Sequence, residues 1–150
     1  MKKSNVLAGL SLLAGVAVFA AGVSAQDMIA NRKAYMKSVG GAAKASGEMI
    51  KGEKPYDAKV AAEGMTKIAA GWADFAKSFP KGTETGGETT ASPKIWENAK
   101  DFGDKGLVLV KAAENAAAEA AKGPEAFKAA FGDVGKNCKG CHEEYRIPKK

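Results

Sequence analysis

The chain has 150 residues, the length of one domain with or without a removable leader. Its 23 basic and 17 acidic residues give a net charge of +6, and the lysines alternate with acids instead of forming the basic run typical of a nucleic-acid binder. The 30 alanines favour helix over sheet. Two cysteines are too few for a disulfide scaffold, and with one histidine they cannot complete a zinc site. Composition therefore excludes sheet folds, disulfide miniproteins and multidomain enzymes.

Residues 1–25 have the three parts of a secretory signal peptide. Two lysines form its positive n-region, residues 7–21 are apolar, and small residues end it, with cleavage expected before Gln26. A membrane anchor is the alternative, but the apolar run is short for a full span. We therefore expect a mature domain of residues 26–150 that works in the periplasm of a bacterium, without a membrane attachment.

Two amphipathic helices are predicted after the leader. Residues 27–51 carry apolar side chains at gaps of three and four, the spacing of one helix face, and Gly52 is a plausible stop. The next helix opens near Pro55 and Asp57, a first-turn proline and a capping acid. Pro80 ends it.

The second half of the chain predicts a crossover and two more helices. Residues 81–91 contain no apolar side chain larger than alanine, so we expect a surface loop. Ser92 caps the third helix, which Gly106 weakens locally, and Gly123-Pro124 separates it from the fourth, which Pro148 stops. Four amphipathic helices with mostly short connections predict an all-α fold, an antiparallel four-helix bundle.

The chemistry is concentrated at Cys138-Lys139-Gly140-Cys141-His142, a C-x-x-C-H motif typical of c-type haem attachment. Residues three apart share a helix face, so both thiols can add to the vinyl groups of one haem while His142 turns towards the iron. A redox dithiol would normally sit at a helix N-terminus after a strand, and a plain disulfide would leave His142 unexplained. We therefore predict one haem c per chain, attached to Cys138 and Cys141, with His142 as axial ligand.

The position of the motif, near the end of the chain and on the last predicted helix, resembles the cytochrome c prime family. The resemblance covers residues 27–146. It implies a left-handed four-helix bundle with haem c in its core, often dimerised through the first two helices. Besides the motif, five stretches carry the resemblance: residues 32–36, 55–57, 79–80 with 82–83, 93–96 and 131–135.

The sixth position of the iron is left open by the sequence. No second histidine exists, so ligation by two histidines is impossible. A methionine could supply the sixth ligand, and four remain after the leader: Met28, Met36, Met49 and Met65. We prefer Met36, which lies four residues after Arg32 on the same helix face. The resemblance places this residue at the distal face, where some members have a coordinating methionine and others leave the iron five-coordinate. A plain core methionine is the alternative.

Four further residues are expected near the haem. The resemblance places Arg32 at a propionate, where a cation would offset a partly buried carboxylate, with Lys33 and Thr90 near the same edge. Arg146 follows His142 by one helical turn, so we expect it near the proximal face, where it also suits the negative end of the helix dipole. Solvated side chains are the alternatives for Arg32 and Lys33.

These residues predict an electron-transfer protein and not an enzyme. The haem would exchange single electrons with a redox partner protein that the sequence does not identify, using His142 and Met36 as ligands. The alternative is a five-coordinate haem that binds nitric oxide or carbon monoxide in an apolar pocket. A peroxidase would need a distal acid–base group, and no distal histidine is available. Small residues such as Gly40 and Gly41 would permit a homodimer.

Overall fold

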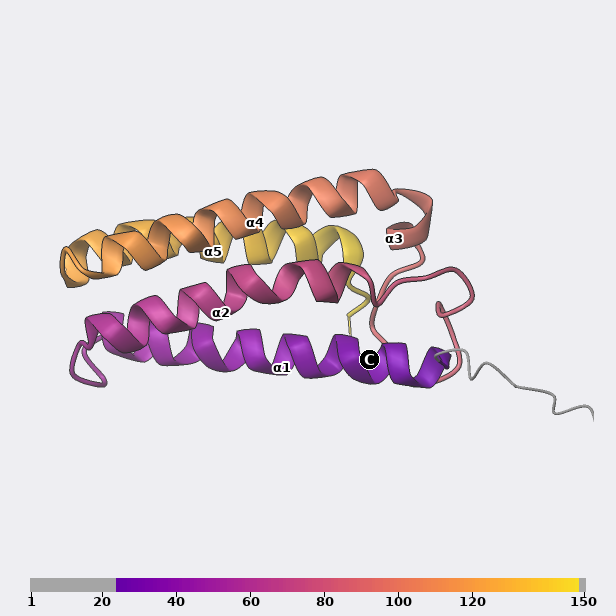
Figure 1. Cartoon of the computed structure of the whole chain (residues 1–150), viewed down its shortest axis with the longest axis horizontal. Coiled ribbons are helices and arrows are strands. Elements are labelled where there is room, and N and C mark those ends of the chain that lie inside the picture. The colour runs from indigo at the N-terminus through magenta and orange to yellow at the C-terminus, as the bar shows by residue number, and fades with distance from the viewer. Residues whose placement is uncertain (1–23, 149–150) are drawn as a thin grey trace, which may run out of the picture.

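The computed structural model describes residues 24–148, which form a bundle of four long helices and one short helix (Figure 1). Helix α2 packs against both α1 and α4, and α4 packs against α5. The predicted all-α bundle is confirmed. No helix within the described part of the chain is long and apolar enough to cross a bilayer. The helices are α1 (Ala25–Ile50), α2 (Ala58–Ala76), α3 (Lys94–Glu97), α4 (Ala99–Ala120) and α5 (Pro124–Tyr145).

Helix α1 begins two residues before its predicted start. The Ser24 hydroxyl accepts the Asp27 N–H, and the Asp27 carboxylate accepts the Ser24 N–H, a reciprocal capping box. The predicted signal peptide lies outside the described residues except for Ser24 and Ala25. Cleavage before Gln26, which stays a prediction, would remove this cap.

The predicted starts of α2 and α5 are confirmed by local chemistry, although Pro55 precedes the first turn of α2. The predicted Ser92 cap is wrong, because α3 has Pro93 at its N-cap and no side-chain cap. The Asp57 carboxylate accepts the Val60 N–H at 3.0 Å and caps α2. Gly123 adopts a φ of 112°, which only glycine tolerates readily, and Pro124 then opens α5. Helix α2 ends at Ala76, before the predicted stop at proline, and α5 ends at Tyr145.

The third predicted helix is broken in two. Asn98 has φ −124° and ψ 46°, outside the helical region, and it separates α3 from α4. The break lets α3 fold towards the crossover, where the Trp96 indole N–H donates to the Pro80 carbonyl at 3.2 Å. Ile95 is buried on the same short helix. These contacts join residues distant in sequence, so the helical periodicity did not reveal them.

Two clusters of buried side chains fill the bundle. The turn-end core lies near the two short connections, residues 51–57 and 121–123, and the crossover-end core lies where the long connection between α2 and α3 meets the end of α5. The crossover-end core consists of Trp72, Phe75, Ile95, Phe102 and Tyr145. The turn-end core consists of Val39, Met49, Ala61, Met65, Ile68, Ala113, Ala116, Ala120, Phe127, Ala130 and Val134.

The crossover is more than the surface loop that the sequence predicted. Thr83 is only 5% exposed within it. Its last residues pair with the end of α5: the Ser92 N–H donates to the Tyr145 carbonyl at 3.0 Å, and the Ile147 N–H donates to the Thr90 carbonyl at 2.8 Å. These backbone bonds fix the C-terminal end of α5 against the crossover.

Candidate functional site

The two motif cysteines lie on α5 where the two cores meet. Cys138 packs against the turn-end core, and Cys141 packs against the crossover-end core. Both side chains are half-buried, no disulfide joins them, and burial raises the pKa of each thiol. A reactive dithiol requires a lowered thiol pKa, so the surroundings disfavour that alternative. The geometry instead suits a group held by both sulfurs between the cores.

His142 follows at the edge of the same helix face and is half-buried. Burial and the charge of Arg146 lower the pKa of His142, which favours the neutral imidazole that can ligate iron. The imidazole borders a surface hollow that Lys139, Glu143, Arg146 and Pro148 also line. The structure thus places Arg146 beside His142, while its role near the proximal face stays a prediction.

Arg32 of α1 is deeply buried, with 5% of its surface exposed. Its Nε donates to the Ser78 carbonyl at 2.7 Å and its Nη1 donates to the Thr83 carbonyl at 2.9 Å, while Nη2 donates to the Thr83 hydroxyl. The guanidinium carbon lies 4.4 Å from the centre of the Phe79 ring and 5.1 Å from that of Trp96. Sequence reasoning missed this role: Arg32 anchors the crossover to α1.

The hydrogen bonds and charge of the Arg32 guanidinium show whether the site suits an anionic cofactor. Three of its five N–H donors are used, and no carboxylate within residues 24–148 lies in salt-bridge range of it. Burial lowers the pKa of Arg32, because desolvation disfavours the charged form, and the charge of Glu84 offsets this only in part. A haem propionate would supply further negative charge, so these residues fit the predicted cofactor.

The remaining residues predicted at the haem edge differ in their placement. Lys33 is exposed on α1. Thr90 is half-buried, and its backbone bond to Ile147 holds it beside the end of α5. The structure therefore brings Thr90 to the same end of the bundle as the motif. Contact of either residue with a propionate stays a prediction.

The four candidate methionines are now distinguished by position. Met36 is half-buried and packs against the crossover-end core, as Cys141 does. Met65 is fully buried in the turn-end core, and the Met49 sulfur accepts the Asp57 N–H at 3.4 Å near the start of α2. Met28 lies in the first turn of α1. Only Met36 among them packs against the same core as Cys141, which favours the predicted choice.

A polar pair that sequence reasoning missed joins α5 to α4 beside the motif. Tyr145 is 4% exposed, and its hydroxyl donates to Asp101 Oδ2 at 2.5 Å. Lys105 Nζ lies 3.5 Å from the same oxygen. The available signal was spacing, because Tyr145 follows Cys141 by four residues and so shares its helix face.

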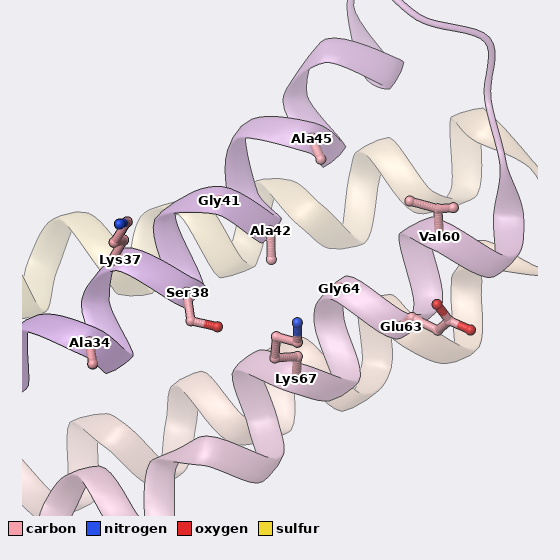
Figure 2. A pocket seen from close by; sticks show the side chains of 10 residues that line it. All are labelled: Ala34, Lys37, Ser38, Gly41, Ala42, Ala45, Val60, Glu63, Gly64 and Lys67. Carbon is pink, nitrogen blue, oxygen red and sulfur yellow. The ribbon is translucent and has the colours of Figure 1, made fainter. Parts of the chain in front are cut away.

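A separate groove runs between α1 and α2 on the outside of the bundle (Figure 2). None of the predicted haem residues lines it. In Figure 2 the side chains of Ser38 and Lys67 point into the space between the two helices. Most of the lining is small: Ala34, Ser38, Gly41, Ala42, Ala45 and Gly64, with Lys37, Val60, Glu63 and Lys67 around them.

Sequence comparison finds one family along nearly the whole chain. The family model described as Cytochrome C' matches residues 27–146. The cytochrome c' of Rhodopseudomonas palustris is 38% identical over 142 residues, covering 93% of this chain and 97% of the relative. A cytochrome c-556 of Agrobacterium tumefaciens (strain apple 185) is 40% identical over 120 residues, covering 79% and 93%.

Solved structures agree with the fold. A cytochrome c' described as having a ligand-controlled dimer dissociation superposes with a TM-score of 0.78 at 32% identity, covering 85% of this chain and 100% of that one. The nitric oxide complex of a mutant cytochrome c prime from Alcaligenes xylosoxidans gives a TM-score of 0.76 at 29% identity, covering 85% and 99%.

Proposed function

The chain belongs to the cytochrome c' family, and on that premise we propose that it is a periplasmic electron carrier whose haem iron is ligated by His142 and Met36. The family carries one covalently attached haem c per chain and consists of haem carriers of the electron-transfer type, not typical enzymes. The predicted signal peptide supports the periplasmic location.

The chain's own residues each have a task towards that cofactor. Cys138 and Cys141 would hold it by thioether bonds across the junction of the two cores, and His142 would supply the axial nitrogen. Arg32 would neutralise a propionate with its two remaining N–H donors. The bound haem supplies an iron that gains and loses one electron. The packed rings of the crossover-end core exclude water from that side.

The observation that carries the His/Met proposal is the packing of Met36. It shares the crossover-end core with Cys141, whereas Met49 and Met65 belong to the turn-end core. A methionine side chain is long and adaptable enough to adjust to a ligand. A thioether is a soft, neutral ligand that raises the reduction potential relative to an open site, which suits an electron carrier.

Visible spectra of both oxidation states test the ligation. We expect a low-spin ferrous protein that binds carbon monoxide poorly, and a Met36→Ala variant that turns high-spin and binds carbon monoxide readily. Met65→Leu is the matched control, because it replaces a buried methionine of the turn-end core and should stay low-spin. A Met36→Ala variant that stays low-spin would assign the sixth ligand to another residue.

A second function is favoured by one comparison. The related cytochrome c prime from Alcaligenes xylosoxidans was solved as a nitric oxide complex of a mutant. If the wild-type protein is high-spin and binds carbon monoxide without any substitution, Met36 is only a wall of the pocket. Binding of diatomic gases by a five-coordinate iron would then replace electron transfer as the proposed function.

The groove between α1 and α2 is our candidate for the homodimer contact that the resemblance implied. Its small side chains allow another helix to approach closely, and exposed Val60 offers apolar area beside them. A Cβ at Gly41 would meet nothing within 4 Å, so Gly41→Gln should fold and yet block docking. Sedimentation should show wild-type and the control Gly132→Gln as dimers and Gly41→Gln as a monomer. A monomeric wild-type protein would refute the contact.

A further inference from the structure

We propose that Asp101, held in place by Tyr145 and Lys105, is a tuning residue that lowers the reduction potential of the haem iron by keeping a negative charge against Tyr145, one helical turn after Cys141. The inference rests on the proposed function, because it requires a haem attached at Cys141. The carboxylate that would tune the reduction potential lies outside the attachment motif.

The geometry fixes the carboxylate on the side of α5. Asp101 lies in the first turn of α4, and its Oδ2 accepts the Tyr145 hydroxyl at 2.5 Å. The Tyr145 ring is itself fixed, since it is 4% exposed and meets Phe102 edge to face with ring centres 5.2 Å apart. Tyr145 and Cys141 contact the same core. The exposed carboxylate of Asp101 is thereby held against the last turn of α5.

Of the three acids at this corner, Asp101 has the longest ion pair. Lys100 pairs with Asp104 at 2.5 Å, and Lys94 of α3 pairs with Glu144 of α5 at 2.9 Å. Lys105 is the ion partner of Asp101, at a longer 3.5 Å.

The Tyr145 hydrogen bond is the main cause that lowers the pKa of Asp101, and Lys105 adds to it, so the carboxylate is ionised at neutral pH. Tyr145 lies one helical turn after Cys141 on the same face of α5, so the bond from its hydroxyl holds this charge near the attachment point.

The sign of the effect follows from charge. Reduction adds one negative charge to the haem, so a fixed carboxylate nearby disfavours the ferrous state and a fixed ammonium favours it. Loss of the Asp101 charge should therefore raise the midpoint potential, and loss of the Lys105 charge should lower it. If Asp101 and Lys105 had only a structural role, replacing them would not shift the midpoint potential in opposite directions.

Potentiometric titration of the haem-loaded protein tests the inference with four variants. We expect Asp101→Asn to shift the midpoint potential upwards and Lys105→Gln to shift it downwards. Tyr145→Phe keeps the ring but releases the carboxylate, so it should give a smaller upward shift. Asp104→Asn is the matched control, since it removes one exposed carboxylate of the same helix that does not contact Tyr145, and its shift should be the smallest.

Two results would overturn the inference. One is an equal shift of the midpoint potential in Asp101→Asn and Asp104→Asn, which would mean that only the net charge of the protein matters. The other is a shift of the same sign, or none, from Asp101→Asn and Lys105→Gln. The mass and absorbance of each purified variant show whether haem is covalently bound. Bound haem with unshifted potentials refutes only the tuning by Asp101. Protein without covalent haem refutes both the tuning and the proposed function.

Discussion

The turn-end core and the crossover-end core of the bundle are packed with side chains of different size. Five of the 11 buried residues of the turn-end core are alanine, which lets the helices approach closely. The crossover-end core contains no alanine and consists mostly of large rings. Polar anchors surround it, from Arg32 to the crossover and from Tyr145 to Asp101. The motif cysteines lie where these two kinds of packing meet.

The largest expected effect comes from removing the attachment point between the two cores. A Cys138→Ala, Cys141→Ala double variant should lack covalent haem and lose packing at the junction, because a vacated volume costs roughly 24 cal/mol per Å³. We expect much of the helix to remain while cooperative unfolding is lost or shifted to much lower temperature. Hydrogen exchange should show protection surviving longest around residues 113–134 of the turn-end core.

This prediction fails if the double variant unfolds cooperatively at the wild-type midpoint. The same outcome would mean that the crossover-end core is complete without a cofactor. A uniform loss of protection at both ends would contradict the division of the bundle into two regions.

Two glycine substitutions should change the free energy of unfolding by smaller amounts and in opposite directions. A Cβ at Gly106 of α4 would lie 1.7 Å from Cζ2 of Trp72, so Gly106→Ala should destabilise the protein by about 1–3 kcal/mol through overpacking. A Cβ at Gly132 of α5 meets nothing within 4 Å, so Gly132→Ala should stabilise it by about 0.5–1 kcal/mol. Urea unfolding measures both, and equal effects at the two sites would contradict the packing of Trp72 on α4.

A further expected effect on stability concerns alkaline pH and the three tyrosines. Burial raises the pKa of Tyr35 to about 12, and burial also raises the pKa of Tyr56 and of Tyr145. Tyrosines of an unfolded chain titrate near pH 10. Above about pH 10 the unfolded chain therefore loses phenolic protons that the folded chain keeps, and the free energy of unfolding should fall as the pH rises towards 12.

Phenolate absorbance follows this titration directly. We expect little phenolate at pH 10 in the folded protein, and we expect Tyr56 of the turn end to ionise before Tyr145, which also faces the negative charge of Asp101. Single replacements by phenylalanine assign each step. Titration of all three tyrosines together near pH 10 would show that neither end shields its hydroxyl groups.

The sequence predicted the features that depend on neighbouring residues. Asp57 and Gly123-Pro124 set helix ends through local hydrogen bonds and backbone conformation, so their positions could be read directly. The motif was equally local, since the three-residue spacing of Cys138 and Cys141 determines their common face. The bundle followed from amphipathic helices joined by mostly short connections.

The features that were missed join residues far apart in the chain. Arg32 hydrogen-bonds residues 46 and 51 positions away, so its role as an anchor of the crossover was not visible from its helix. Gly106 was read as a weak point of a helix, whereas it provides the space that the Trp72 ring occupies. The break at Asn98 likewise follows from contacts of α3 with the crossover.

The central claim is that Cys138, Cys141 and His142 form the haem site at the junction of the two cores. Mass spectrometry of the proteolytic fragment that contains the motif tests it most directly, after acid–acetone treatment of the purified protein. We predict one fragment that carries residues 138–142 together with one haem, with no titratable thiol. A fragment with free thiols or with a disulfide between the two cysteines, and extractable haem or none, would contradict the account.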